Sequence, residues 1–482
     1  MTIITGKQYT ERIDQLNNEV WIKGERVNGK LSLHPAFSGI LKSKSALYDL
    51  QHQPETSELL TRTDESGIFN FAFEQPTTIE DLRKRRLATQ LWARKSGGTI
   101  GRSPDYINTA IMTLGSSHTF FDEPYSKNVQ HIFKQAKKKD LSFTHTFINP
   151  QVNRSPHYLE FSNDNIIAAK IIDETDEGII IHGARLLATQ GGLTDEILVL
   201  PVGGNQIDPA YVYAFAIPSN TPGLKFLCRE SYADTTVSKY DHPLTTQFDE
   251  VDSIVVFNKV LVPWDRVFLY QDLTAIGKIY TEPSVNILLL FQAVCRQVVK
   301  TEFLLGVSEA LATMIAITDY QHIQEKISEV IITLEIMQSL LHKAEAEAQL
   351  NRFGTMIPDA NPLMVASSYY QKTYPRLVEI LHLLGASGFI SLPTEKDFDS
   401  EIGKDLDQYL QAKNAPAKER VQLFRLAWDL TMSSFGSRQT QYERFFFGDP
   451  IRLASSLYQS YDKTTYTQQV SNFLHPETKE KN

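Results

Sequence analysis

Apolar residues recur at helical spacing in the first 140 residues, which are therefore predicted to be mainly helical. Thr77 and Glu80 predict a capping box at the start of one helix, and the glycine pair at 97–98 predicts its end. A second helix is expected to begin within the stretch GRSPDY, at residues 101–106. The N-terminal part of the chain is thus expected to be a helical domain.

Four long apolar patterns lie in the C-terminal part of the chain. Residues 286–315 are apolar nearly all round, as in a buried helix, and residues 323–344 carry a single apolar stripe. Residues 363–384 and 417–435 predict two more helices, the first with a kink at Pro375. Four long helices with apolar faces indicate a helical bundle.

The period of the apolar pattern changes to two at residue 141. In the segment 141–148, Leu141, Phe143, His145 and Phe147 alternate with serine and threonine residues, which predicts a strand. Several short β-rich runs follow, separated by acidic or Gly/Pro turns, and the last ends near Phe268. Because no long helical pattern interrupts them, we expect an antiparallel sandwich or barrel.

The order of these patterns predicts an α+β protein with several domains. We expect an N-terminal helical domain at 1–140, a central β domain at 141–275, a C-terminal four-helix bundle at 276–460 and a C-terminal arm at 461–482. This order resembles the acyl-CoA dehydrogenase fold, in which a flavin lies between the β domain and the bundle. A resemblance of fold says little about chemistry.

Composition and missing motifs exclude several classes of function. The net charge of the 482 residues is −9, so neither nucleic acid nor an anionic membrane is an expected partner. The chain has no apolar run of membrane-spanning length, no signal peptide and only two cysteines, Cys228 and Cys295, so a cytoplasmic protein is expected. It also has no GxGxxG after a strand, P-loop, HExxH or GxSxG motif, and no histidine pair with convincing ligand spacing, so no metal site is predicted.

The stretch GRSPDY places a cation at the start of a helix. Ser103 is the predicted N-cap, and Pro104 suits the first helical position. Arg102 then lies at the positive end of the helix dipole, where a cation costs about 0.3–1 kcal/mol. Either Arg102 is a surface residue beside an ordinary helix cap, or it shares the helix end with an anion.

Two more stretches are unusual. In HTFINPQVNR, residues 145–154, His145 shares a predicted strand face with Phe143 and Phe147, where a lone histidine is most often a satisfied core residue. The Asn-Pro turn that follows is expected to expose polar side chains. The stretch SRQTQYERFFFGDP, residues 437–450, is predicted to be a capping loop after the last bundle helix.

Six stretches, in this order along the chain, resemble the large oxygenase component of the 4-hydroxyphenylacetate 3-monooxygenase family: GRSPDY, HTFINPQVNR, HGARLLATQGG, VLVPWDRVF, GASGFISLP and YERFFFGDP. The resemblance runs from the first helices to about residue 450. It implies a two-component flavoprotein of aromatic catabolism, in which a separate reductase supplies reduced FAD. With this FAD and dioxygen, the subunit would hydroxylate a phenol ortho to its hydroxyl group and so form a catechol. The resemblance also implies a homotetramer with the acyl-CoA dehydrogenase fold.

By the same resemblance, Arg102, Tyr106 and His145 hold the hydroxyl group of the substrate. A phenolate is more electron-rich than a phenol, and a positive charge with hydrogen-bond donors lowers the phenol pKa from about 10. Arg102 and the helix N-terminus would supply this field. His145 is expected either to accept the phenolic proton or to donate a hydrogen bond to the activated oxygen, and both roles stay open at this point.

The resemblance also implies which residues bind the flavin. They are His145, Thr146, Phe147, Gln151, Val152, Asn153, Arg154, Thr189, Phe447, Gly448, Asp449 and Pro450. Arg154 is expected to meet the pyrophosphate. Gly385 and Gly388 resemble a turn that meets the flavin of a neighbouring subunit, or else Gly385 simply caps the C-terminus of a helix.

The sequence leaves alternatives open for both the substrate and the class of reaction. Phenylacetate hydroxylases carry small hydroxyl side chains where this chain reads PVGG at 201–204, so a chlorinated or nitro-substituted phenol is an alternative to 4-hydroxyphenylacetate. Gly203 and Gly204 are predicted to contact the substrate, within a candidate mobile lid. A 4-hydroxybutyryl-CoA dehydratase-like enzyme would need an iron–sulfur cluster held by three cysteines and a histidine, and the chain has two cysteines. A non-catalytic assembly protein that keeps the fold is the third class.

Overall fold

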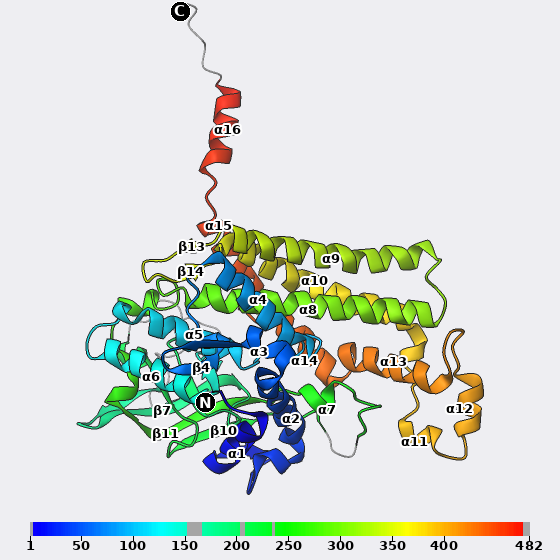
Figure 1. The fold of residues 1–482 in the computed structure, drawn as a ribbon, viewed down its shortest axis with the longest axis horizontal. Coiled ribbons are helices and arrows are strands. Elements are labelled where there is room, and N and C mark those ends of the chain that lie inside the picture. The colour runs from blue at the N-terminus through cyan, green and yellow to red at the C-terminus, as the bar shows by residue number, and fades with distance from the viewer. Residues whose placement is uncertain (1–2, 152–165, 203–207, 234–236, 476–482) are drawn as a thin grey trace, which may run out of the picture.

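The computed structural model describes residues 3–151, 166–202, 208–233 and 237–475. The β domain lies beside the N-terminal helices, and the long helices α8, α9 and α10 run together along another side of the molecule (Figure 1). The predicted α+β order of helices, β domain and helical bundle is confirmed. The domain boundaries at 140, 275 and 460 stay predictions. None of the described helices is both long and apolar enough to cross a membrane.

Six helices make up most of the N-terminal region. They are α1 (Gly6–Leu16), α2 (Pro35–Asp49), α3 (Pro54–Leu60), α4 (Ile79–Arg94), α5 (Asp105–Ser116) and α6 (Tyr125–Lys139), with a hairpin of β3 (Thr61–Asp64) and β4 (Gly67–Asn70). The capping box of α4 lies one residue later than the predicted pair Thr77 and Glu80, because the Asp81 N–H donates to Thr78 Oγ1 at 3.1 Å. Asp81 Oδ2 in turn accepts from the N–H groups of Thr77 and Thr78, each at 2.9 Å, which fixes the later start.

Two sheets share one apolar core in the β domain. The six-stranded sheet has the order β2 (Glu25–Arg26), β1 (Val20–Ile22), β10 (Leu224–Cys228), β11 (Asp252–Pro263), β7 (Gly178–Thr189) and β6 (Lys170–Glu174). The four-stranded sheet has the order β12 (Val267–Tyr270), β9 (Tyr213–Pro218), β8 (Glu196–Val199) and β5 (Phe143–Thr146). Ile181 and Phe257 of the first sheet and Phe215 of the second are buried in the shared core.

Most neighbouring strands of these sheets are antiparallel, as predicted, and two pairs are not. β5 pairs in parallel with β8, and β1 pairs in parallel with β10. Since β1 comes from the N-terminal helical region, the first residues of the chain help to build the central sheet. The short helix α7 (Thr245–Phe248) lies between β10 and β11 along the chain.

Four long helices form the C-terminal bundle. They are α8 (Val285–Met314), α9 (Gln321–Ala346), α10 (Ala360–Gly385) and α13 (Ala417–Thr431). Helix α10 continues through Pro375, and all four helices contribute to one buried cluster. The shorter elements β13 (Gln349–Leu350), β14 (Met356–Ile357), α11 (Glu395–Phe398) and α12 (Gly403–Tyr409) lie in the connections.

The segment after α13 differs from its prediction. The predicted helix at 417–435 ends at Thr431. A separate helix, α14 (Ser434–Phe445), begins at Ser434, capped by the Ser433 hydroxyl, which accepts from the Gly436 N–H at 3.0 Å. The predicted capping loop at 437–450 is therefore wrong, because most of it is helix. Its buried face carries Gln439 and Glu443, and polar residues on a buried face hide the apolar pattern by which such a helix is recognised.

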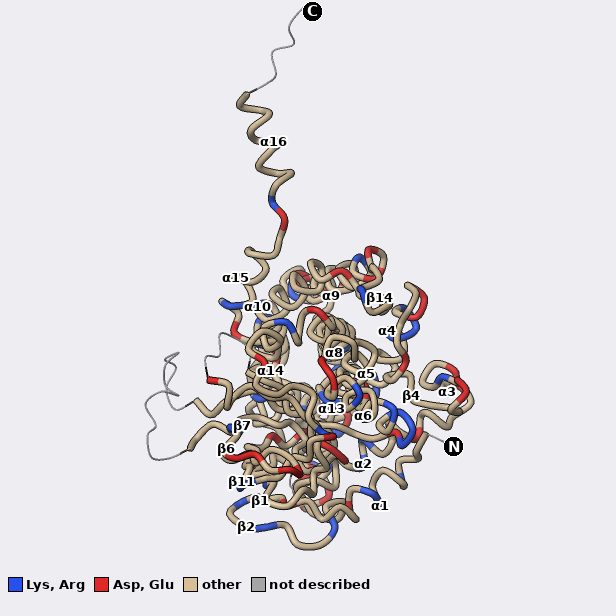
Figure 2. The backbone as a smooth tube through the Cα atoms, turned by 90° about the vertical axis from the view of Figure 1, so that its left-hand side faces the viewer, with Lys and Arg blue, Asp and Glu red and all other residues tan. Residues whose placement is uncertain are grey.

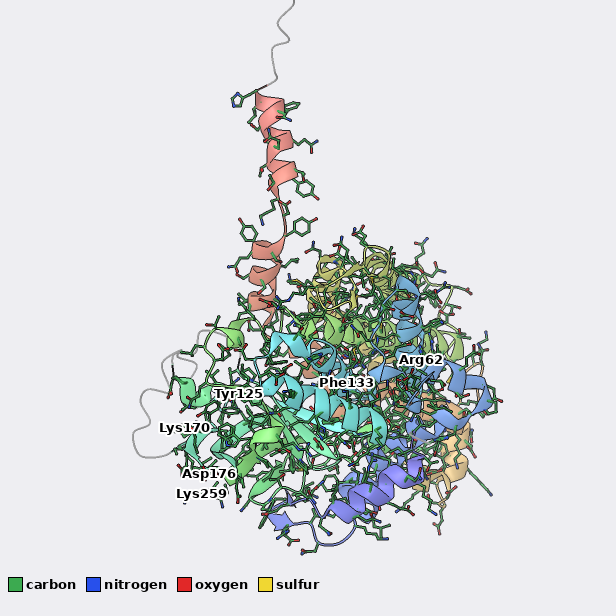
Figure 3. All side chains as sticks on the ribbon, turned by 60° about the vertical axis from the view of Figure 1, so that its left-hand side comes forward. Arg62, Tyr125, Phe133, Lys170, Asp176 and Lys259 are labelled. Atoms are coloured by element: carbon green, nitrogen blue, oxygen red, sulfur yellow. The ribbon has the colours of Figure 1, made fainter. Side chains whose placement is uncertain are left out.

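The last two helices of the described part of the chain are α15 (Pro450–Ser460) and α16 (Thr464–Leu474). The arm predicted for 461–482 is helical as far as Leu474. Helix α16 projects away from the body, and its side chains stand clear of any other element (Figure 3). It carries no Lys, Arg, Asp or Glu, so the tube of Figure 2 is tan along its length.

Candidate active site

The GRSPDY loop is fixed by a network of hydrogen bonds between buried polar side chains. Helix α5 begins at Asp105, and Pro104 occupies the N-cap position without a side-chain cap. Ser103 is therefore not the N-cap that the sequence predicted, because its hydroxyl donates to the Asp105 carboxylate instead. Thr89 Oγ1 also donates to Asp105, at 2.8 Å, and Gln292 Nε2 donates to Ser103 Oγ at 3.2 Å. Burial raises the pKa of Asp105, and the hydrogen bonds from Ser103, Thr89 and Gln292 oppose this shift.

The backbone of the Gly101–Arg102 pair is fixed by one buried carboxylate. Glu250 accepts from the N–H groups of Gly101 and Arg102, each at 2.7 Å. Gln190 Nε2 donates to Glu250 Oε1 at 2.9 Å and to the Arg102 carbonyl oxygen at 3.1 Å. The carboxylate of Glu250 thus places a negative charge beside Arg102, which offsets the helix dipole.

The Arg102 guanidinium lies among aromatic rings. Its Cζ is 4.3 Å from the ring centre of Tyr106 and 4.8 Å from that of Phe446, and its Nη1 donates to the Tyr442 hydroxyl at 2.7 Å. Burial by itself lowers the pKa of Arg102, but the hydroxyls of Tyr442 and Tyr106 and the carboxylate of Glu250 raise it overall. Arg102 is therefore a permanent cation in a ring-lined site.

His145 lies beside this cation on β5. Its ring centre is 5.9 Å from that of Tyr106, and the ring stacks on Phe147 at 5.5 Å. Burial, followed by the charge of Arg102, holds the pKa of His145 well below its usual range. The imidazole is consequently neutral at pH 7. The structure brings together the three residues Arg102, Tyr106 and His145, which the sequence placed in one site.

Two fully buried polar atoms of Arg102 and His145 have no hydrogen-bond partner among the described residues. They are Arg102 Nε and His145 Nδ1. Buried polar atoms in native proteins are nearly always hydrogen-bonded, and an unpaired one calls for an explanation such as a ligand. Both nitrogens belong to side chains that contact or approach the Tyr106 ring, and unpaired nitrogens there suit a small oxygen-bearing ligand.

The predicted flavin residues near β5 and β7 are partly described. Thr146 Oγ1 donates to the Leu186 carbonyl oxygen at 3.3 Å, Phe147 is 36% exposed, and Gln151 is exposed. Thr189 Oγ1 donates to Asp252 Oδ1 at 2.8 Å. The predicted flavin residues Val152, Asn153 and Arg154 and the predicted substrate residues Gly203 and Gly204 lie outside the described residues.

Thr189 is connected to the Arg102 loop through a charged network. Asp252, which accepts from Thr189, also accepts from Arg438 Nε and Nη2, each at 2.8 Å. Arg438 Nη1 lies 3.9 Å from Glu250 Oε2, and Glu250 holds the backbone of Arg102. A residue predicted to bind flavin and a residue predicted to bind substrate therefore share one rigid support.

Residues 446–449 form the turn between α14 and α15, and Pro450 is the first residue of α15. The rings of Phe447 and Phe446 are 5.3 Å apart, and Phe446 is 5.7 Å from Tyr106. Gln371 Nε2 donates to the Gly448 carbonyl oxygen at 3.1 Å, and Asp449 Oδ1 caps α15 by accepting from the Ile451 N–H at 2.9 Å. The turn therefore reaches the site through Phe446.

Gly385 and Gly388 allow close packing at the end of α10. A Cβ on Gly385 would lie 2.2 Å from the Phe389 ring, and one on Gly388 would lie 2.6 Å from the Phe424 ring. The alternative that Gly385 is the helix C-cap is wrong, because Gly385 is the last helical residue and Ala386, at φ 43°, is the cap.

Four residues of the site were missed by sequence reasoning: Tyr442, Phe446, Glu250 and Gln190. The spacing of Tyr442 and Phe446 is i, i+4, so a helix there would have placed both on one face. Glu250 and Gln190 act through backbone groups, for which the sequence has no signal. Among the described residues, no group of three or more His, Cys, Asp and Glu side chains could hold a metal ion.

Known families and proteins match nearly the whole chain. Residues 5–269 match the model of the 4-hydroxyphenylacetate 3-hydroxylase N-terminal domain, and residues 276–475 match that of its C-terminal domain. A probable 4-hydroxyphenylacetate 3-monooxygenase of Bacillus subtilis is 51% identical over 99% of this chain and 100% of its own. The oxygenase component of a 4-nitrophenol 2-monooxygenase from a Rhodococcus species is 31% identical over 92% of this chain and 86% of its own.

Solved structures give the same relationship. The crystal structure of a 4-hydroxyphenylacetate 3-monooxygenase oxygenase component with FAD and 4-hydroxyphenylacetate superposes with a TM-score of 0.93, at 41% identity over 98% of both chains. An archaeal 4-hydroxybutyryl-CoA dehydratase from N. maritimus has a TM-score of 0.88 at 19% identity over 98% of this chain and 95% of its own, which is a likeness of fold alone. From the domain models and the near relatives, the chain belongs to the 4-hydroxyphenylacetate 3-hydroxylase family.

Proposed function

We propose that the protein is the oxygenase component of a two-component flavin monooxygenase, which hydroxylates a phenol at the ortho position to give a catechol. The names of its relatives support this activity, as does the solved relative with FAD and 4-hydroxyphenylacetate. The observation that carries the proposal is the pair of unpaired buried nitrogens, Arg102 Nε and His145 Nδ1, in side chains near the Tyr106 ring.

The residues at the end of β5 fit a bound flavin. The partly exposed ring of Phe147 and the unpaired Nδ1 of His145 suit a flat, polar ligand. We assign FAD binding to His145, Thr146 and Phe147, to residues 151–154, to Thr189 and to residues 447–450, which span the turn before α15 and its first residue. When bound, reduced FAD supplies the activation of dioxygen. The protein residues bind and orient the flavin and the phenol, and they exclude water from the site.

Arg102 stabilises the phenolic oxygen of the substrate as it gains negative charge. A guanidinium whose pKa is raised keeps its charge throughout the working pH range. The low pKa of His145 makes it a weak base for a phenol whose own pKa is near 10. His145 therefore acts as a neutral hydrogen-bond partner of the phenol, since burial and the charge of Arg102 both disfavour its protonated form. Tyr106, whose ring lies near both residues, completes the contact with the hydroxyl group.

A separate reductase supplies the reduced FAD, as the description "oxygenase component" of several relatives implies. The working form is a homotetramer. Exposed apolar residues support subunit contacts: Phe473 in the arm is 86% exposed, and Ile390 beyond α10 is 82% exposed. An apolar groove of about 420 Å³, lined by Phe303 and Val307 of α8 and Leu423 of α13, offers a further contact surface. A cytoplasmic location stays a prediction.

The substrate is 4-hydroxyphenylacetate or a phenol with another para substituent. The relative named for 4-nitrophenol shows that the family extends to other phenols. Pro201 and Val202 have no hydroxyl side chain, so a carboxylate held by serine or threonine at these two positions is not part of this site. The dehydratase-like alternative has no support in the cysteine content, since Cys295 is buried and Cys228 is the only other cysteine.

A panel of phenols tests the proposal. The protein is supplied with FAD, NADH, a generic flavin reductase and air, and catechol products are identified by mass spectrometry. We expect a catechol from at least one para-substituted phenol and none from the reductase alone. Bound iron, together with the visible absorbance of an iron–sulfur cluster in anaerobically purified protein, would favour the dehydratase class. Failure to bind reduced FAD in an anaerobic titration would favour an assembly protein.

A further inference from the structure

The hydrogen-bond donors of Arg102 divide into a used end and a free edge. Nη1 donates to the Tyr442 hydroxyl at 2.7 Å and approaches the Gly101 carbonyl oxygen at 3.4 Å. Nε is buried without a partner, and Nη2 has no hydrogen bond within the described parts of the chain. The Nε–H and one N–H of Nη2 point in the same direction. Together they form the Nε–Nη2 edge of the guanidinium, which can bind an oxygen ligand through two hydrogen bonds.

Aromatic rings limit the rotation of the guanidinium. Its Cζ is 4.3 Å from the ring centre of Tyr106 and 4.8 Å from that of Phe446, and Phe446 in turn stacks on Tyr442 at 4.7 Å. The Tyr442 hydroxyl also touches the backbone of the loop, because a Cβ on Gly101 would lie 2.1 Å from it. Tyr442 therefore contacts both the backbone and the side chain of the Gly101–Arg102 pair.

Tyr442 is itself held in place by ion pairs of its helix. The next residue, Glu443, is fully buried and accepts from Arg296 Nη1 at 2.7 Å, Arg296 Nη2 at 3.0 Å and Lys300 Nζ at 2.8 Å on α8. One turn earlier, Arg438 pairs with Asp252 on β11. Helix α14 is thus tied to both the bundle and the β domain, and it presents Tyr442 at a fixed position.

We propose that Tyr442 is a positioning residue, which occupies Nη1 of Arg102 and thereby directs the free Nε–Nη2 edge at the phenolic oxygen of the substrate. This inference rests on the proposed function, and in particular on the role of Arg102. Burial raises the pKa of Tyr442, so its hydroxyl stays neutral. It therefore accepts a hydrogen bond from Arg102 without neutralising the charge of the guanidinium. Loss of the hydroxyl would leave the rings in place and free only the orientation of the guanidinium.

The test compares the ionisation of a bound chromophoric phenol in three variants. 4-Nitrophenol is titrated from pH 5 to pH 9 by absorbance in the presence of protein saturated with FAD. In the unaltered protein, we expect the pKa of bound 4-nitrophenol to lie below its value in solution. Tyr442→Phe is expected to raise this bound pKa by about one unit. Arg102→Ala is expected to raise it further, and Tyr409→Phe, a matched change at an exposed tyrosine of α12, is expected to leave it unchanged.

The outcomes separate the inference from the proposed function. If Arg102→Ala raises the pKa of bound 4-nitrophenol and Tyr442→Phe leaves it unchanged, the positioning role of Tyr442 is overturned and the role of Arg102 stands. If Arg102→Ala leaves it unchanged as well, both are overturned. Gly101→Ala is the second variant, should Tyr442→Phe fail to fold, because its Cβ would displace the Tyr442 hydroxyl. It is expected to raise the bound pKa in the same way, and a wild-type value would overturn the inference.

Discussion

Replacement of Arg102 by alanine is expected to remove most of the hydroxylation activity. The free edge of its guanidinium carries two N–H groups, one on Nε and one on Nη2, that would face the phenolic oxygen. A hydrogen bond to a charged group contributes about 1.5–3 kcal/mol, so the loss of both is about 3–6 kcal/mol of transition-state stabilisation. At 1.36 kcal/mol for each factor of ten, kcat/KM for the phenol falls by roughly 10²- to 10⁴-fold.

The same replacement changes the fold and the flavin site much less. Alanine leaves the backbone N–H groups of residues 101 and 102 on Glu250, since these bonds do not involve the side chain. The loss of ring contacts and of the bond to Tyr442 costs about 1–3 kcal/mol of stability. We therefore expect an apparent melting temperature a few degrees lower, and a dissociation constant for reduced FAD within about tenfold of the unaltered protein.

The assay follows catechol formation at a series of phenol concentrations with a generic flavin reductase. A separate anaerobic titration gives the dissociation constant for reduced FAD. Arg352→Ala serves as the matched control, because Arg352 is an exposed arginine paired with Glu282. If Arg102→Ala hydroxylated within about threefold of the unaltered protein, the assignment of Arg102 to the phenolic oxygen would be refuted.

Three further predictions follow from the described contacts. His145→Ala is expected to release hydrogen peroxide at the expense of catechol, because the neutral imidazole no longer holds the phenol; unchanged coupling of oxygen use to product would contradict its role. Burial raises the pKa of Asp140 to about 6 in the folded protein, above its usual value of 3.8. The free energy of unfolding therefore falls as pH rises from about 4 to about 6. Asp140→Asn, at a residue with φ 48°, is therefore expected to raise the apparent melting temperature at pH 8 and to have little effect near pH 4, and equal effects at both pH values would contradict this account. Truncation before α16 is expected to shift the mass measured by light scattering below that of a tetramer, and an unchanged mass would exclude the arm from the subunit contacts.

The long helices were predictable because each carries its own signal. The apolar stripe of α9 and the apolar surface of α8 are properties of consecutive residues, and burial of that surface determines the element. Helix α14 had no such signal, because its buried face pairs Glu443 with Arg296 and Lys300, which lie more than 140 positions earlier in the chain. Polar pairing across that distance replaces the apolar contact that a sequence pattern reveals.

The residues of the candidate site likewise divide into those with a local sequence signal and those that only the fold brings in. Arg102 and His145 lie in unusual local stretches, and the family resemblance joined them to Tyr106 before the structure placed the three together. Tyr442 lies 340 positions from Arg102, and only the fold brings them into contact. Ser103 was assigned to the wrong role for a local reason. As an N-cap, the Ser103 hydroxyl would accept from an N–H group of the helix start, but in this loop it donates to the buried carboxylate of Asp105 instead.

Isotopic labelling of the product tests the central claim most directly. The protein, with FAD, a flavin reductase and a para-substituted phenol, is exposed to isotopically labelled dioxygen in unlabelled water, and the product is analysed by mass spectrometry. The account predicts a catechol that has gained one labelled oxygen atom ortho to the original hydroxyl group, and much less of it with Arg102→Ala. Unlabelled catechol, or oxygen consumption with hydrogen peroxide as the only product for every phenol tested, would contradict it.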